Sequence, residues 1–362
     1  MLGVGWRSWG MGLLLAALLA RGALAQSPAG PAFHDAHYHP TDYIQQETAL
    51  PEFLGMMGDR VGRVALMGIP LQQKWDWFES GDRAPDYYLR SDAALYYYPF
   101  VDAMVAEAVL ALPPEQQVRF DPMITGFNPT DMYATDHIRR VLRLYPGVFS
   151  GIGEFSIHKE VVTPKTVGHM ASLRNPALDR ILEFAGEVGL LTLIHNDVDV
   201  VLPHAGARPT HFDPFIEVVR RHPGTTILWA HAGLGRFVEP TPGYVGMLEE
   251  LLRDEELSHL YLDLSWDVVA EQIVAPPETL AAWISLVDRW PDRFILGSDA
   301  VVATQADSYL GALEVWRPLL DGLDRDASEK VRLGNYERLF DSARIRVRAW
   351  EAAQTEQSRR PR

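Results

Sequence analysis

The stretch Phe33–Pro40, FHDAHYHP, places three of the chain's 12 histidines within eight residues. Side chains on a β-strand alternate between its two faces, so Asp35, His37 and His39 are expected to share one face. Two imidazoles at positions i and i+2 near a strand end can converge on one ion, and Pro40 would end the strand. The spacing therefore favours a metal site at the end of a first strand. The alternative is a polar loop in which the histidines have no common role.

Seven further short apolar runs, each ending in polar residues, follow along the chain: Val61–Ile69, Val118–Phe127, Val148–Phe155, Leu190–His195, Thr225–His231, Leu260–Ser265 and Phe294–Asp299. Helical patterns separate the later runs. In one of them Asn175 is suited to cap a helix that starts with Pro176, and Gly189 is suited to end it. Eight strand–helix units predict an α/β fold, a closed parallel (β/α)₈ TIM barrel, rather than an open sheet.

The regular spacing is interrupted once, between Ile69 and Val118, by a segment rich in aromatic residues: Trp75, Trp77, Phe78, Tyr87, Tyr88, Tyr96, Tyr97, Tyr98 and Phe100. Because this insertion follows the C-terminal end of strand two, it is expected to lie over the active-site face of the barrel. Trp75 and Tyr97 are the substrate contacts predicted from it. Ordinary packing and an oligomer contact are the alternatives. Residues Pro99–Leu112 are expected to form the second barrel helix.

The first 25 residues have the pattern of a signal peptide. Arg7 gives a positive start, Met11–Ala20 is a short apolar core, and Ala23–Ala25 has small residues at the cleavage positions. We therefore expect export to the periplasm or the medium, with an uncleaved anchor as the alternative. The barrel is expected to span residues 26–345, followed by a polar, disordered tail at 346–362.

Composition limits the chemistry and the partners. The chain has no cysteine, so disulfides and thiolate ligands are excluded and stability must come from a large core. A formal net charge of −15 disfavours nucleic acid as a partner. We expect a small-molecule substrate and no membrane association after signal cleavage, and we keep a homo-oligomer open.

The residues that end the expected strands are of the types that bind divalent metals: His37, His39, Glu154 (in GIGEF), His195 (in TLIHND), His231 (in LWAHAG) and Asp299 (in LGSDA). In a parallel barrel these strand ends meet at one face. Imidazole and carboxylate ligands suit Zn²⁺, with Mn²⁺, Fe²⁺ and Co²⁺ as alternatives. A single histidine at a strand end is more often structural, so the prediction rests on the whole set.

The order His-x-His, Glu, His, His, Asp, with HAG after strand six, resembles the amidohydrolase superfamily. The closing segment Leu333–Phe340, LGNYERLF, is similar to the last helix of its amidohydrolase-related branch, which also contains decarboxylases and lactonases. The resemblance covers residues from about 32 to 341. It implies a metal-dependent TIM-barrel hydrolase.

The resemblance also implies roles for individual residues. His37, His39 and Asp299 would hold a first metal ion. His195 and His231 would hold a second ion, or serve as ligand and substrate-polarising imidazole beside a single one. Asp299 would also accept the proton of the attacking water.

Glu154 resembles the bridging glutamate of TatD-type hydrolases, which favours two ions, whereas many members of the amidohydrolase-related branch use one. The number of ions, one or two, stays open. Lys159 is interpreted as a loop charge or a substrate contact. Asp35 and Asp263 are either carboxylates that orient a histidine or ordinary hydrogen-bonded groups of the barrel.

His204 and Arg208 lie in the loop after strand five and are predicted to contact an anionic group of the substrate. The resemblance favours hydrolysis of an ester, lactone or amide. A metal-dependent decarboxylase of the same branch and a non-catalytic binding barrel are the alternatives.

Overall fold

The structure of the protein, a computed structural model, describes residues 30–204 and 206–359. The compact unit that contains the expected barrel is Pro31–Arg362. The expected signal peptide at 1–25 lies outside the described residues. Among the described residues, none of the helices is both long enough and apolar enough to span a membrane.

The centre of this unit is a sheet in which every strand pairs in parallel with its neighbours. Its strands are β1 (Phe33–His39), β2 (Val61–Met67), β5 (Phe120–Ile124), β6 (Gly151–Ser156), β7 (Leu191–His195), β8 (Ile227–Trp229), β9 (Leu260–Leu264), β10 (Phe294–Leu296) and β11 (Ala300–Val301). Short β10 and β11 are two parts of the eighth strand. Since β10 pairs with β9 and β11 pairs with β1, the sheet closes on itself. The predicted (β/α)₈ barrel is confirmed.

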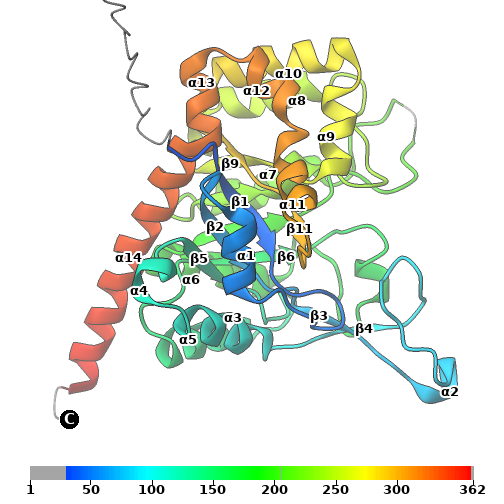
Figure 1. Cartoon of the computed structure of the whole chain (residues 1–362). Coiled ribbons are helices and arrows are strands. Elements are labelled where there is room, and N and C mark those ends of the chain that lie inside the picture. Colours follow the sequence, from blue (N-terminus) through cyan, green and yellow to red (C-terminus); the bar gives the residue numbers. More distant parts are fainter. Residues whose placement is uncertain (1–29, 205, 360–362) are drawn as a thin grey trace, which may run out of the picture. The chain divides into compact units, whose positions relative to one another are not determined.

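Helices cover the outside of the barrel (Figure 1). They are α1 (Leu50–Met57), α3 (Val101–Leu110), α4 (Pro114–Gln117), α5 (Ala134–Leu144), α6 (Pro176–Val188), α7 (Phe212–Arg221), α8 (Tyr244–Arg253), α9 (Asp267–Val274), α10 (Pro277–Arg289), α11 (Ala306–Glu314), α12 (Arg317–Gly322), α13 (Arg325–Glu329) and α14 (Asn335–Arg359). The signals around α6 act as predicted: Asn175 Oδ1 accepts a hydrogen bond from the Ala177 amide at 2.9 Å, and Gly189 follows with a φ of 87°.

Alternation along the strands divides the core into two layers. Leu193 belongs to the cluster inside the barrel, while its neighbour Ile194 belongs to the larger cluster between the sheet and the helices. The first turns of α14 complete the inner cluster with Tyr336 and Phe340. Burial on both faces of the strands supplies the large core that a chain without disulfides requires.

Strand β1 departs from simple alternation. His37 and His39 both face the strand-end site, as predicted, but Asp35 does not share their role. Its carboxylate instead accepts a hydrogen bond from Tyr309 on α11 at 3.0 Å. The physical reason is a shift in the pairing of β1 with β2 on each side of Asp35, which breaks the period of two.

The expectation of a disordered tail is wrong for residues 346–359, which continue helix α14. Val347 is buried, and the Trp350 ring packs edge-on against Phe184 with 5.8 Å between ring centres. Arg348 donates to the Phe149 carbonyl at 2.8 Å. A narrow apolar stripe at helical spacing within a polar sequence is enough to hold this helix on the barrel.

The insertion after β2 forms a small antiparallel pair, β3 (Leu71–Gln73) with β4 (Leu95–Tyr97), and the one-turn helix α2 (Trp77–Ser80). The helix expected at Pro99–Leu112 is α3.

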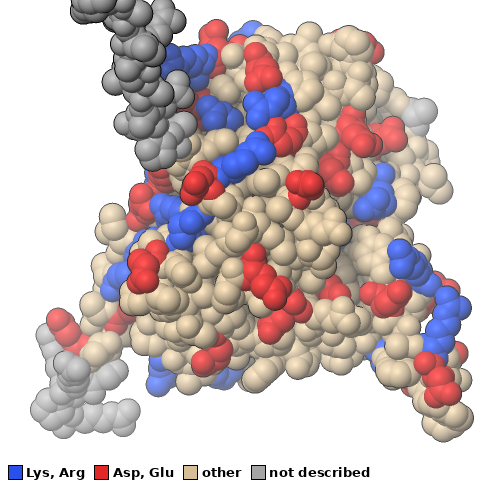
Figure 2. Space-filling view, viewed as in Figure 1, with Lys and Arg blue, Asp and Glu red and all other residues tan. Residues whose placement is uncertain are grey.

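On the face shown in Figure 2, acidic and basic side chains of the described part lie interspersed. The expectation about nucleic acid stays a prediction.

Candidate metal centre

The C-terminal strand ends bring all six predicted ligand residues together. His37 and His39 come from β1, Glu154 from β6 and His195 from β7. His231 lies two residues after β8, and Asp299 lies between β10 and β11. Donor atoms of His37, His39 and Asp299 form one compact group, and those of Glu154, His195 and His231 form another. The five histidine and glutamate side chains are buried, and only 9 % of the Asp299 side chain is exposed.

The group of His37, His39 and Asp299 has the spacing of metal ligands. The two Nε2 atoms are 3.2 Å apart, and Asp299 Oδ1 lies 3.4 Å from the first and 3.1 Å from the second. Ligands about 2.0–2.1 Å from a tetrahedral Zn²⁺ are separated from one another by about 3.3 Å. The three atoms therefore fit around one ion of this size.

The rings are oriented so that Nε2, rather than Nδ1, faces the centre. His39 Nδ1 lies 2.7 Å from the Met67 carbonyl, which can only accept, so this nitrogen carries the hydrogen. His37 Nδ1 lies 2.8 Å from Asp263 Oδ2. In the neutral rings both Nε2 atoms then carry lone pairs that point at each other, an arrangement that calls for a cation between them.

His231 is oriented in the same way. Its Nδ1 lies 2.8 Å from Ser265 Oγ, and that hydroxyl donates to Asp263 Oδ2 at 2.5 Å. Within the described residues, His231 Nε2 is buried and has no hydrogen-bond partner. A buried polar atom without a partner is costly, so this nitrogen is also suited to an ion or a substrate atom. The open question about Asp263 is answered, since this carboxylate orients His37 directly and His231 through Ser265.

The backbone is strained where these side chains turn inward. His231, Trp266 and Asp299 have φ values of 54°, 72° and 51°, in the left-handed region that residues with a Cβ rarely adopt. Each such residue costs on the order of 1–3 kcal/mol and is typical of functional sites.

Asp35 holds the segment before Asp299 in place. It accepts from the Ser298 amide at 2.8 Å, the Ser298 hydroxyl at 2.7 Å and the His37 amide at 3.0 Å. Burial raises the pKa of Asp35 to about 6, although these hydrogen bonds oppose the rise. Asp35 therefore positions backbone on both sides of the site and orients no imidazole ring.

The centre attracts positive charge. Burial alone would lower the pKa of His37, but the negative charges of Asp299 and Asp263 hold it well above its usual value. Burial alone would raise the pKa of Asp299, but His37 and His231 hold it well below its usual range. A group of imidazoles and ionised carboxylates in a buried site is the donor set that a divalent ion binds.

Lys159 lies inside the site, with 9 % of its side chain exposed. Its ammonium nitrogen is 3.1 Å from Glu154 Oε1 and 3.2 Å from Oε2. Glu154 Oε1 also lies 2.5 Å from His195 Nδ1. The interpretation of Lys159 as a loop charge is therefore wrong, because its ammonium is buried against a predicted ligand.

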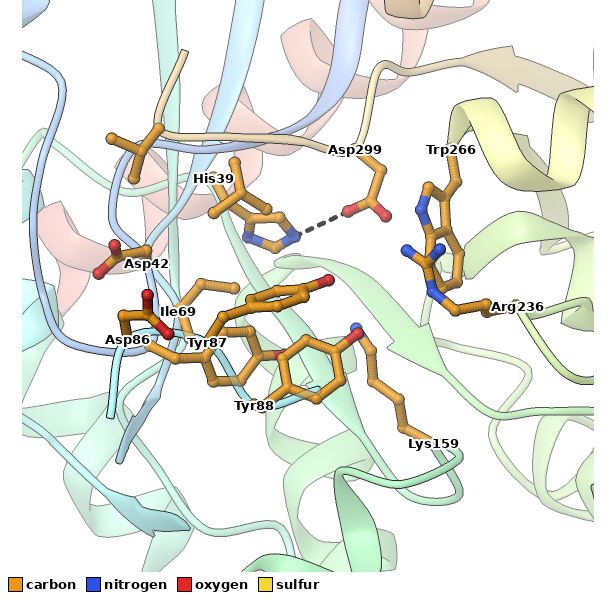
Figure 3. A pocket seen from close by; sticks show the side chains of 13 residues that line it. His39, Asp42, Ile69, Asp86, Tyr87, Tyr88, Lys159, Arg236, Trp266 and Asp299 are labelled. Carbon is orange, nitrogen blue, oxygen red and sulfur yellow. Dashed lines mark ion pairs between the residues drawn. The ribbon is translucent and has the colours of Figure 1, made fainter. Parts of the chain in front are cut away.

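A pocket of about 370 Å³ opens above the centre, and Asp299, His39 and Lys159 are among the residues that line it. Figure 3 shows Tyr87 and Tyr88 on one side of it and Trp266 with Arg236 on the other. The Arg236 guanidinium stacks on the Trp266 ring, 5.1 Å from its centre.

Comparison with known families agrees with this geometry. The amidohydrolase family model Amidohydro_2 matches residues 34–341. The chain belongs to the amidohydrolase family. The resemblance inferred from the strand-end motifs is confirmed, and the protein is an amidohydrolase-type enzyme.

Solved structures show the same fold. An amidohydrolase from Burkholderia multivorans with bound zinc is 14% identical, with a TM-score of 0.51 over 85% of this chain and 99% of that one. A dihydroorotase from Campylobacter jejuni is 16% identical, with a TM-score of 0.50 over 85% and 83% of the two chains. The curated proteins contain no match to this sequence.

The four predicted substrate contacts of this amidohydrolase do not line the pocket above the centre. Arg208 is exposed and forms an ion pair with Asp213, and His204 lines a separate pocket. Trp75 is 56 % exposed. The Tyr97 hydroxyl lies 3.1 Å from His169 Nδ1, and Tyr97 is not among the residues that line the pocket.

Sequence reasoning overlooked Arg236 and Trp266 as pocket residues. Arg236 follows the HAG motif by three residues, and Trp266 follows the strand-end Ser265. Both lie in loops after barrel strands, which are the loops that form active sites in this fold. That rule, applied to every strand rather than only to metal-ligand residue types, would have identified them.

Proposed function

We propose that this amidohydrolase is a metal-dependent hydrolase that uses a metal-activated water to attack the carbonyl of an ester, lactone or amide. The observation that carries the proposal is the spacing of His37, His39 and Asp299, which fits one tetrahedral ion, with Zn²⁺ the first choice. A divalent ion bound by these residues would lower the pKa of its water to about 7 and so supply hydroxide near neutral pH.

Asp299 is the proposed proton acceptor. Its Oδ1 faces His37 and His39, while its Oδ2 lies 3.8 Å from His231 Nε2 and is left to take the proton of the attacking water. Because its pKa is held well below the usual range, Asp299 stays ionised at working pH. It would then return the proton to the leaving oxygen or nitrogen.

His231 is the proposed group that polarises the substrate carbonyl. Its Nε2 has no partner in the described part of the chain, and the contact between Nδ1 and Ser265 fixes the ring. In the protonated ring both nitrogens carry a hydrogen, so Nε2 would donate to the carbonyl oxygen. A fixed group beside the carbonyl needs no reorganisation during the reaction, and this is the condition for effective electrostatic stabilisation.

The pocket supports a substrate that carries a carboxylate next to an apolar or planar group. Arg236 forms no ion pair with the described residues, and its Nε is buried without a hydrogen-bond partner. A guanidinium pairs with a carboxylate through two parallel hydrogen bonds. Tyr87, Tyr88 and Trp266 offer aromatic faces for the rest of the molecule. Arg236 thus replaces Arg208 and His204 as the proposed contact with an anionic group.

Export to the periplasm or the medium belongs to the same proposal. Its support is the sequence of residues 1–25, with a positive start, a short apolar core and small residues at a cleavage position. We propose a small molecule as the partner and no nucleic acid, consistent with the acidic charge.

Chelation with product analysis tests the proposal. Dialysis against a strong chelator is expected to abolish turnover of a panel of carboxylate-bearing esters, lactones and amides, and added Zn²⁺ or Mn²⁺ to restore it. The products are expected to be a new carboxylate with an alcohol or amine. Full activity in verified metal-free protein would refute metal dependence, and release of carbon dioxide would identify a decarboxylase instead.

A further inference from the structure

The carboxylate of Glu154 is paired with the ammonium group of Lys159. The Lys159 ammonium lies within 3.2 Å of both carboxylate oxygens, and both side chains are buried. The loop after β6 turns so that the Lys159 side chain reaches Glu154. The Lys159 amide holds this turn by donating to Thr163 Oγ1 at 2.9 Å. A charge pair shielded from water interacts much more strongly than one at the surface.

The donor atoms of Glu154, His195 and His231 lie close together, but with the Lys159 ammonium at Glu154 they are unevenly spaced. His195 Nδ1 is 2.5 Å from Glu154 Oε1, a hydrogen-bond distance well below the separation of about 3.3 Å that two ligands of one tetrahedral ion require. His231 Nε2, in contrast, is 3.8 Å from the same oxygen. These distances differ from the even spacing around His37, His39 and Asp299.

His195 has a carboxylate oxygen beside each of its ring nitrogens. Its Nδ1 faces Glu154, and its Nε2 lies 2.9 Å from Asp197 Oδ1. A histidine binds a metal through a nitrogen that carries no hydrogen and has no other partner. A neutral imidazole carries one N–H, so His195 can donate to only one of these two carboxylates, and its other nitrogen keeps a lone pair that could bind an ion if the Lys159 ammonium were absent.

We propose that the Lys159 ammonium stands in the place of a second metal ion, so that the centre binds one divalent ion, through His37, His39 and Asp299. Lys159 is then a positioning residue, which keeps Glu154 charged and fixed beside that ion. The inference rests on the proposed metal-dependent function. It concerns the number of ions, which the resemblance to bridging glutamates left open.

The number of ions in the parent protein is the first test. Full-length protein is loaded with excess Zn²⁺, desalted and analysed for metal per chain, and one ion is expected. Two ions would overturn this inference and leave the proposed hydrolase intact, whereas none would refute the metal-dependent function itself. In Mn²⁺-loaded protein, the electron spin resonance spectrum is expected to be that of an isolated ion, and a spin-coupled pair would overturn the inference.

Removal of the ammonium is the second test. Lys159→Met is expected to bind a second ion, because Glu154 then lacks a cation, and Lys159→Arg is expected to stay at one. Lys165→Met is the matched control: it removes a lysine from the same loop whose ammonium contacts the carbonyls of Tyr88 and Ser91 and the exposed Asp92 instead of Glu154, and it should bind one ion. A folded Lys159→Met that binds one ion would overturn the proposal. If that variant does not fold, Lys159→Gln, which keeps a hydrogen-bond donor, is judged by the same count.

Discussion

Asp263 and His37 lie 226 residues apart in the sequence, yet Oδ2 of the first is 2.8 Å from Nδ1 of the second. The same oxygen accepts from Ser265, which contacts His231. One buried carboxylate thus orients two of the imidazoles in the candidate centre. Partners of this kind fix the ring and raise the basicity of the nitrogen that faces the metal.

Asp263→Ala is therefore expected to weaken metal binding by about 10–100-fold, since the loss of such a partner typically has this effect. Competition with a chromogenic chelator measures the dissociation constant. Asp267→Ala, which removes an exposed carboxylate on α9, is the control and should bind metal as the parent does. Parent-like affinity in Asp263→Ala would show that His37 is oriented without this carboxylate.

Asp299→Asn is expected to fold, to retain at least part of its metal and to lose at least about 100-fold in kcat, because the amide cannot accept a proton. If Asp299 only caps the local backbone, the variant would instead lose about 1 kcal/mol of stability with turnover nearly intact. Metal content, melting temperature and kcat, measured on one preparation, separate the two outcomes. A kcat within about tenfold of the parent value would contradict the role of Asp299 as proton acceptor.

Gly297→Ala is expected to disturb the candidate metal centre by displacing the backbone of His37. A Cβ at this position would lie 2.6 Å from His37 Cβ and 3.0 Å from its amide nitrogen, so strand β1 must shift. We expect a loss of about 1–3 kcal/mol in the free energy of unfolding, as is typical of overpacking, together with weaker metal binding. Gly311→Ala on α11 is the control, because a Cβ added there would have no other atom of the described chain within 4 Å. Denaturant unfolding of both variants, with and without metal, checks the difference.

Arg236→Gln is expected to raise KM for a carboxylate-bearing substrate by about 10-fold or more, since hydrogen bonds to charged groups contribute about 1.5–3 kcal/mol. The methyl ester or amide of the same carboxylate should be turned over equally well by the variant and the parent. Arg208→Gln removes a guanidinium that is already paired with Asp213. This control should change neither the KM for the carboxylate-bearing substrate nor the turnover of its methyl ester or amide. Equal effects of Arg236→Gln on charged and neutral substrates would rule out the proposed carboxylate contact.

His158 is expected to make stability depend on pH. Burial and the neighbouring His211, whose ring stacks on it with 3.8 Å between centres, lower the pKa of His158 to about 4. The unfolded chain therefore binds a proton between the ordinary value of 6.5 and about 4, whereas the folded protein does not. Stability from this group is present above pH 6.5 and is lost as the pH falls towards 4.

In His158→Gln the fall in unfolding free energy from pH 7 to pH 4 should be smaller than in the parent by about 1–2 kcal/mol, a figure reduced for the partial exposure of the ring. Urea unfolding at a series of pH values measures it. The control is His204→Gln at an exposed position, which should follow the parent curve. Parallel curves for His158→Gln and the parent would contradict the effect.

Local sequence patterns were sufficient for the barrel and for the identity of the strand-end residues. The eight barrel strands and several helices are encoded by short-range signals, such as the apolar run that ends at His195 and the capping pair at Asn175 and Gly189. Once eight parallel strands are predicted, closure of the barrel requires their ends to meet, so His37, His231 and Asp299 could be grouped without a structure.

Only the tertiary structure decided what each of these side chains contacts. Asp263 orients His37 across the closed barrel, Lys159 reaches Glu154 because the loop after β6 turns back, and Arg236 stacks on Trp266 from a different loop. These contacts depend on loop paths and on strand pairing over long distances, which no local period encodes. The pairing shift at Asp35 and the apolar stripe of α14 were missed for the same reason: each is stabilised by packing against residues far away in the chain.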